Sequence, residues 1–184
     1  MWNELELKIK IDIKCNPLKS RLEPFVGEGN KNADIFVVFD SITKSMSACK
    51  SIIPSDECKM LKTIFEFSKI NFDDCFFTTL NRYYNPNIIE YEERNTCMKF
   101  LLEEIYLVKP KYIVVVGEEI FNFMYMYYTK KKKNKKYVDI VKNVGTVFDF
   151  YGIPLIPIYD MSYISKAKLE EKRKLVQVLK EIKK

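Results

Sequence analysis

The chain has 184 residues, of which 31 are basic and 25 acidic, and it contains no histidine. This length suits one domain with a substantial core, and a composition of 47% hydrophobic residues with 5 glycines and 7 prolines excludes a disordered or collagen-like chain. The missing histidine excludes any mechanism that needs an imidazole base or metal ligand. The net charge of +6 equals one run of six lysines: Lys130, Lys131, Lys132, Lys133, Lys135 and Lys136.

Cysteine usage and the N-terminus predict a location in the cytoplasm. The five cysteines are odd in number and widely spaced, which favours reduced thiols over a disulfide framework. Residues 1–14 carry charges throughout and lack the apolar stretch of a secretory signal. The longest apolar runs are strand-sized, far short of the roughly 20 residues of a membrane span. We therefore expect a cytoplasmic protein that does not associate with membranes.

Hydrophobic periodicity predicts strands that alternate with helices. Apolar and charged residues alternate over 4–14, which predicts a half-buried strand, and a glycine loop over 27–30 follows. Apolar runs predict buried strands at 34–39, 75–79 and 111–116, with shorter strands at 146–150 and 154–158. Helical spacing predicts one helix that begins after the N-cap Ser55 and two more over 92–108 and 118–128. It also predicts a C-terminal helix that has Leu169, Val176, Leu179 and Ile182 on one face. The polar composition of residues 41–54 predicts an irregular segment. The pattern as a whole predicts a single α/β domain over 1–184 around a largely parallel sheet.

Polar residues follow three of the predicted strands, at the edge of the sheet where such folds bind ligands. Asp40 follows the first core strand, Asn81 follows the second after Thr79, and Asp160 follows the last. Two carboxylates with polar neighbours could form a site. The alternative is that these residues are polar only because the chain returns to water.

Four ordered segments of the chain resemble the uracil-DNA glycosylase superfamily, and most closely its branch with an iron–sulfur cluster. They are G-E-G-N-K-N-A-D-I-F-V-V from Gly27, F-F-T-T from Phe76, L-V-K-P-K-Y-I-V-V-V-G from Leu107 and Y-G-I-P-L-I-P-I from Tyr151. The resemblance runs from about Cys15 to the C-terminal helix. It implies a three-layer α/β/α sandwich around a mainly parallel sheet, with a pocket at the strand ends that receives a base flipped out of DNA.

The catalytic motifs that the resemblance implies are altered in this chain. In place of the family's Gly-Glu-Ala-Pro-Gly loop, the chain has Phe39-Asp40-Ser41-Ile42-Thr43, which keeps a carboxylate but neither glycine. Thr79 stands where the family reads the base with an asparagine, and Asn81 is a shifted substitute. Asp160 stands where a histidine stabilises the departing base, and its negative charge has the wrong sign for that task.

The cluster signature is altered as well. Cys15 and Cys97 match two of the four ligand positions, whereas the other two correspond to Asp12 and a residue near Tyr83. A cluster of this type needs four thiolates, so we expect no iron–sulfur centre, no metal and no other cofactor.

Three surface features suggest partners. The lysine-rich loop over 129–137 lies near the family's DNA-contacting side, so we expect its six lysines to bind phosphates, the alternative being a solvated loop. Tyr83, Tyr84, Tyr125, Tyr127 and Tyr128 could stack on bases, although we expect at least half to pack in the core. The segment 4–14, where the family usually has a helix, could pair as a strand with the sheet edge or another chain.

These features favour a catalytically degenerate glycosylase-fold protein that acts by binding nucleic acid, with DNA preferred, or a protein partner. The first alternative is an active, divergent DNA glycosylase in which Asp40 activates water. The second alternative is a viral or mobile-element protein that antagonises a host nucleic-acid enzyme. This second alternative predicts that truncation of residues 1–14 damages function more than replacement of the six lysines does.

Overall fold

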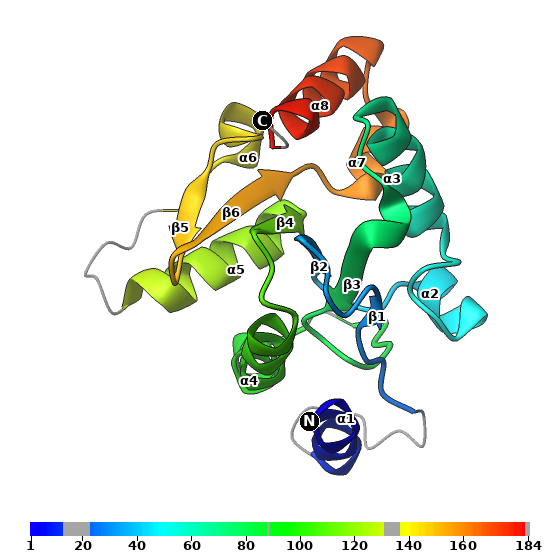
Figure 1. Ribbon diagram of the computed structural model, residues 1–184, viewed down its shortest axis with the longest axis vertical. Coiled ribbons are helices and arrows are strands. Elements are labelled where there is room, and N and C mark those ends of the chain that lie inside the picture. The colour runs from blue at the N-terminus through cyan, green and yellow to red at the C-terminus, as the bar shows by residue number, and fades with distance from the viewer. Residues whose placement is uncertain (13–22, 88, 131–136, 183–184) are drawn as a thin grey trace.

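The structure of the chain, a computed structural model, describes residues 1–12, 23–87, 89–130 and 137–182 (Figure 1). The strands in these ranges are β1 (Glu28–Gly29), β2 (Ile35–Phe39), β3 (Cys75–Thr79), β4 (Tyr112–Val116), β5 (Phe148–Phe150) and β6 (Ile153–Ile158). The helices are α1 (Trp2–Ile11), α2 (Lys44–Cys49), α3 (Asp56–Phe67), α4 (Tyr91–Val108), α5 (Glu118–Thr129), α6 (Ile140–Asn143), α7 (Met161–Lys166) and α8 (Leu169–Glu181), with a 3-10 turn η2 (Phe72–Asp74).

The strands form one sheet in the order β1-β3-β2-β4-β6-β5. Its four central strands are parallel, whereas β1 and β5 pair antiparallel at the two edges. Every residue of β2 and β3 is buried, as expected for strands that are covered on both faces. The predicted buried strands and the mainly parallel sheet are therefore confirmed.

Helices cover both faces of the sheet and make three layers (Figure 1). Helices α4 and α5 lie on one face, with α1 packed against α4, while α3, α7 and α8 lie on the other. Ser55 caps α3 as predicted, because its hydroxyl accepts a hydrogen bond from the Cys58 N–H at 3.3 Å. The predicted core face of α4 is buried too, including Cys97, Leu101 and Ile105. The three-layer α/β/α architecture is confirmed.

The prediction of a strand over residues 4–14 is wrong, because residues 2–11 form the helix α1. Leu5 and Ile9, four residues apart, are fully buried on its inner face, whereas Leu7 and Ile11 are more than half exposed. The Lys8 ammonium reaches Glu103 on α4 at 2.6 Å. With a helix here, the described part of the segment offers no strand for pairing with a sheet edge or with another chain.

Three shorter elements also differ from the predictions. Residues 41–54 are not wholly irregular, because Thr43 caps the helix α2 by accepting a hydrogen bond from the Met46 N–H. The glycine loop contains the two-residue strand β1. Asp160 caps a short helix, α7, that periodicity did not predict.

The predicted apolar face of α8 is only partly correct. Leu175 and Leu179 are fully buried, and Ile182 is nearly so. Leu169 is instead 62% exposed, and Val176 is only partly buried. Among the described residues, no helix is both long and apolar enough to span a membrane.

Candidate functional site

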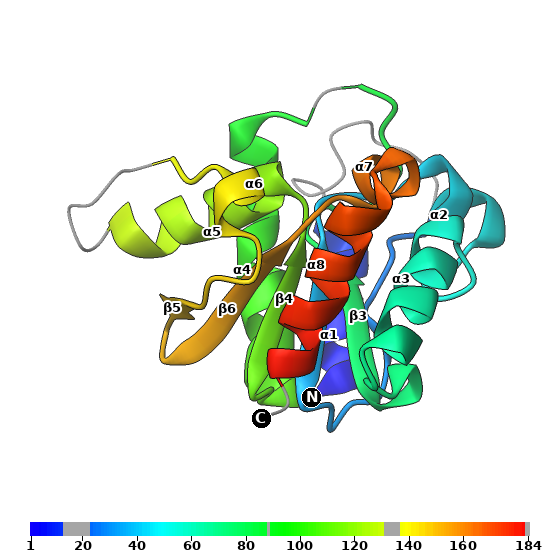
Figure 2. The ribbon, with the colours of Figure 1, turned by 90° about the horizontal axis from the view of Figure 1, so that it is seen from above.

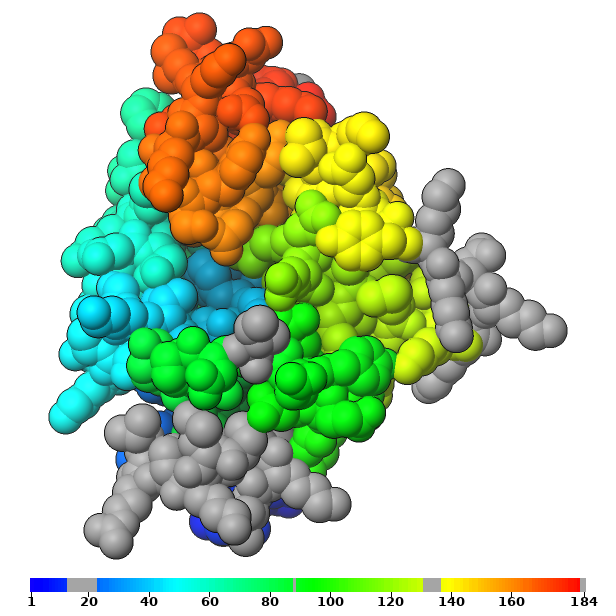
Figure 3. Space-filling model, turned by 180° about the vertical axis from the view of Figure 1, so that it is seen from behind, coloured from blue at the N-terminus to red at the C-terminus, as the bar shows by residue number. Residues whose placement is uncertain are grey.

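The carboxyl ends of the central strands meet at one edge of the sheet. Strand register pairs Phe39 of β2 with Thr79 of β3 and with Val116 of β4, and pairs Val116 with Ile158 of β6. The residues that follow these strand ends therefore lie side by side, and Figure 3 shows this face. The blue segment after β2 lies there between the orange α7, the light-green start of α5 and the green segment after β3. Asp40, Asn81 and Asp160 all follow strands at this edge.

Asp40 is held by an ion pair. Its Oδ2 accepts a hydrogen bond from Arg94 Nη2 at 2.9 Å, and its Oδ1 is buried with no hydrogen-bond partner among the described residues. Burial raises the pKa of Asp40 above its ordinary value, and the positive charge of Arg94 offsets only part of that increase. The negative charges of Glu119 and Asp160 raise the same pKa further.

Arg94 links the two helices that begin at this edge. It comes from the first turn of α4 and also donates to Glu119 Oε2, in the first turn of α5, at 2.8 Å. Burial opposes its charge, but the charges of Asp40 and Glu119 outweigh burial and raise the pKa of Arg94. The sequence did not single out Arg94. The feature of the sequence that could have identified it is an arginine near the N-terminus of a predicted helix, because the helix dipole disfavours a cation there unless an anion lies nearby.

Thr79 and Asn81 bond to the backbone around the site. The Thr79 hydroxyl donates to the Asn81 carbonyl at 2.8 Å, and Asn81 Nδ2 donates to the Asp40 carbonyl at 3.0 Å. Both side chains are buried. These bonds hold the turn after β3 against the turn after β2.

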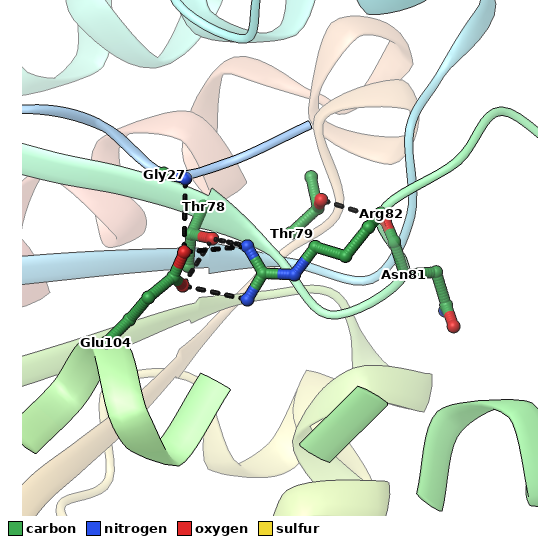
Figure 4. A network of polar contacts seen from close by, with 6 residues as sticks. All are labelled: Gly27, Thr78, Thr79, Asn81, Arg82 and Glu104. Carbon is green, nitrogen blue, oxygen red and sulfur yellow. Dashed lines mark hydrogen bonds and ion pairs between the residues drawn. The ribbon is translucent and has the colours of Figure 1, made fainter. Parts of the chain in front are cut away.

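A second polar residue that sequence reasoning missed lies just beyond this turn. Arg82 is fully buried and makes a bidentate ion pair with Glu104 of α4, both distances being 2.8 Å (Figure 4). Arg82 also donates to the Thr78 hydroxyl, and Glu104 accepts from the Gly27 N–H at 3.1 Å. Gly27 has no room for a side chain, since a Cβ would lie 2.3 Å from the Phe76 ring. The network fastens β3, α4 and the glycine loop together beneath the site.

Asp160 is exposed and lies beside Gly117. Its Oδ1 accepts the Ser162 N–H at 2.7 Å, which caps α7. A carboxylate in this position has a structural role that is sufficient to explain it.

Of the six predicted phosphate-binding lysines, only Lys130 is among the described residues. It follows α5, and its ammonium lies 4.7 Å from the centre of the Tyr91 ring, at the start of α4. Lys131, Lys132, Lys133, Lys135 and Lys136 lie outside the described ranges.

All five tyrosines singled out from the sequence pack in or against the core, which confirms that at least half of them are packing residues. Tyr83 and Tyr128 are buried, and Tyr125 stacks on Phe121 with ring centres 5.8 Å apart. Tyr91, which was not singled out, is 41% exposed and contacts Phe123 edge-on.

The positions implied for an iron–sulfur cluster do not fit a four-thiolate site. Cys97 is buried on α4, but the Asp12 carboxylate is bound by Lys99 and Tyr83 is a buried phenol. Cys15 lies outside the described residues. Within the described ranges, no group of three or more cysteine and carboxylate side chains could hold a metal ion. The loss of the cluster remains a prediction.

Fold and site together define a class: an α/β/α sandwich with its polar site at the carboxyl ends of parallel strands. A family model named Uracil DNA glycosylase superfamily matches residues 23–183. The chain therefore belongs to the uracil-DNA glycosylase superfamily. A search of curated proteins found no significant match.

Proposed function

We propose that this chain is a DNA-binding member of its superfamily that does not excise uracil. The observation that carries the proposal is the state of Asp40, the one carboxylate at the position of the catalytic loop. One of its oxygens is bound by Arg94 and the other is buried. For Asp40 to activate a water, its ion pair with Arg94 would first have to open.

The loop around Asp40 supports the same reading. Phe39 is buried in β2, Ile42 is buried and bridges to Tyr84, and Thr43 caps α2. A flipped base would need close backbone approach, which glycines permit and these side chains obstruct. The loop is therefore committed to packing and capping.

The electrostatics of the departing base are also unfavourable. Negative charge develops on a base as its glycosidic bond breaks, and donors or cations must stabilise it. Asp160 places a carboxylate at this edge, and the chain has no histidine that could replace it. Asp40 and Glu119 add two further carboxylates, and among the described residues Arg94 is the one cation paired with them.

Binding rests on the lysine run, which supplies the whole net charge of the chain. Clustered lysines bind phosphates by charge, without sequence preference, and release counterions as they do so. Lys130 lies beside Tyr91 at the start of α4, the helix that also carries Arg94. The run therefore begins next to the helix that contributes to the candidate site.

A charge-matched pair of variants tests the binding. Replacing Lys131, Lys132 and Lys133 by serine removes three charges from the run, and replacing Lys31, Lys109 and Lys111 removes three from residues that precede β2 and β4 at the opposite edge. Fluorescence anisotropy with single- and double-stranded DNA and RNA, over a series of salt concentrations, measures both. We expect the first variant to bind DNA at least tenfold more weakly and to lose about two to three from the slope of log K against log salt. Equal losses in the two variants would contradict a site in the run.

A second candidate function is a divergent, active glycosylase. It is favoured by the raised pKa of Asp40 and by its unpartnered Oδ1, since a carboxylate with these properties is a candidate general base once Arg94 moves away. Oligonucleotides that carry different damaged bases separate the two functions. Release of one base that depends on Asp40 would favour this candidate.

A further inference from the structure

A groove of about 690 Å³ lies between α3 and α8, away from the strand ends. The two helices run side by side and leave the strand-end edge in the same direction (Figure 2). Its apolar lining comes from one face of each helix, with Met60, Ile64 and Phe67 on α3 and with Leu169 and Val176 on α8. Ile164 of α7 also lines the groove.

Two of the apolar residues that line this groove are largely exposed. Phe67 is 68% exposed and Leu169 is 62% exposed, although both belong to well-formed helices. Helix α8 buries Leu175 and Leu179 on one face, and on the groove side it presents two apolar residues among basic and polar ones. The groove therefore exposes one large apolar side chain where α3 ends and another where α8 begins, and exposed apolar surface in a groove is a feature of interaction sites.

The charged residues that line the groove all have the same sign. They are Lys172, Arg173 and Lys180 of α8, and no carboxylate lines the groove. Lys172 donates to the Ser165 carbonyl at 3.3 Å. Arg173 and Lys180 form no ion pair with any residue in the described part of the chain. The complementary ligand is therefore apolar along its centre and acidic along its margin.

The length and shape of the groove fit a helix. Helices α3 and α8 have 12 and 13 residues. The residues of α8 that line the groove run from Leu169 to Lys180, about 17 Å at 1.5 Å per residue, which matches three turns of a bound helix. Two adjacent helices offer a depression in which a third can seat its apolar ridge.

We propose that this groove binds an acidic amphipathic helix of a partner protein. The helix inserts apolar residues spaced i, i+3 or i+4, and i+7 between Phe67 and Leu169, and its carboxylates pair with Arg173 and Lys180. This surface is separate from the strand-end site, so a partner can bind while the site faces nucleic acid. The proposal does not depend on DNA binding.

Selection from a displayed library of random 16-residue peptides tests the proposal with the full-length protein as bait. We expect the enriched peptides to carry net negative charge and the apolar spacing of a three-turn helix. Their affinity, measured by fluorescence anisotropy, should fall at least tenfold in Phe67→Ser and in Leu169→Ser, and should fall in the double variant Arg173→Glu, Lys180→Glu. Tyr106→Ser, which removes an equally exposed aromatic outside the groove, should leave affinity unchanged. Thermal melts show that each variant is folded.

Enrichment of only basic peptides, or of peptides that bind Phe67→Ser and Leu169→Ser as well as wild type, would overturn the proposal. Two further measurements identify other occupants. Sedimentation of the wild type that shows a dimer lost in Phe67→Ser would assign the groove to a second copy of the chain. Binding to phosphatidylserine vesicles that is lost in the same variant, without any enriched peptide, would assign it to a lipid surface. Either result would also overturn the proposal.

Discussion

Asp40 and Arg94 lie 54 residues apart in sequence and 2.9 Å apart in the structure. A carboxylate at this edge could be predicted, because a buried strand ends at Phe39 and Asp40 follows it. Its partner could not be predicted, because the pairing depends on where α4 begins relative to β2. Arg82 and Glu104 were missed for a different reason: charged residues normally indicate a surface, and only the fold shows that both are buried.

The first prediction concerns Asp40 and pH. The pKa of Asp40 is raised in the folded state, so the folded chain binds the proton of this carboxyl group more tightly than the unfolded chain does. The contribution of Asp40 to stability therefore falls as pH rises from the ordinary pKa of 3.8 to the raised pKa. Asp40→Asn does not titrate. The free energy of unfolding of the variant, relative to wild type, should therefore increase as pH rises, as measured by urea denaturation at a series of pH values. A relative decrease would show that Arg94 stabilises the carboxylate more than burial destabilises it.

The second prediction uses two adjacent glutamates. Glu104→Gln leaves the buried Arg82 guanidinium without its counter-charge and should cost about 3–5 kcal/mol of unfolding free energy. Glu103→Gln loses the ion pair with Lys8, in which both side chains are about a third or more exposed, and should cost far less than Glu104→Gln. Chemical denaturation measures both. Similar costs for the two variants would contradict a structural role for the buried network.

Among the elements, α1 shows how a pattern can indicate the wrong structure. Strict alternation places Leu5, Leu7, Ile9 and Ile11 on one face of a strand. The same sequence also has apolar residues at i and i+4, and these bury Leu5 and Ile9 against the body of the protein when the segment is helical. Packing against α4 decides between the two, and periodicity alone carries no information about it.

The third prediction separates a helix from a strand in this segment. Ile9→Ala should lower the free energy of unfolding by about 2–5 kcal/mol, because Ile9 is fully buried. Leu7→Ala should change it by less than about 0.5 kcal/mol, because Leu7 is 58% exposed. Urea denaturation measures both variants. Equal losses would indicate that the two residues share a buried face, as a strand requires.

Helix α8 gives a related lesson about apolar residues. Periodicity placed Leu169 and Val176 on the core face together with Leu179, but Leu169 is exposed and Val176 is only partly buried. When apolar residues lie on more than one side of a helix, their spacing in the sequence does not show which of them face the core. Only the structure shows that one face contacts the core and the other lines a groove.

At the scale of the whole molecule, the fold was predictable because its central strands are buried on both faces. Such strands are continuous apolar runs, and the segments between them have helical spacing, so few arrangements satisfy both. The position of the candidate site follows from the fold, because parallel strands end at the same edge. The state of that site does not follow, since it depends on ion pairs and hydrogen bonds between distant residues.

At the same scale, we propose that the chain has kept the fold of its superfamily and has lost uracil excision. Asp40 is bound by Arg94, Thr79 and Asn81 bond to the backbone, and Asp160 caps α7. Each candidate catalytic group therefore has a structural partner in place of a substrate. DNA binding should survive substitution of Asp40, because the lysine run that is proposed to bind phosphates does not include it.

The most direct test is uracil release from single- and double-stranded DNA under single-turnover conditions, with the protein in excess and DNA binding measured in the same samples. We predict that wild type and Asp40→Ala bind DNA equally and that neither releases uracil above the background of protein-free DNA. Robust release by the wild type that is abolished in Asp40→Ala would contradict the account.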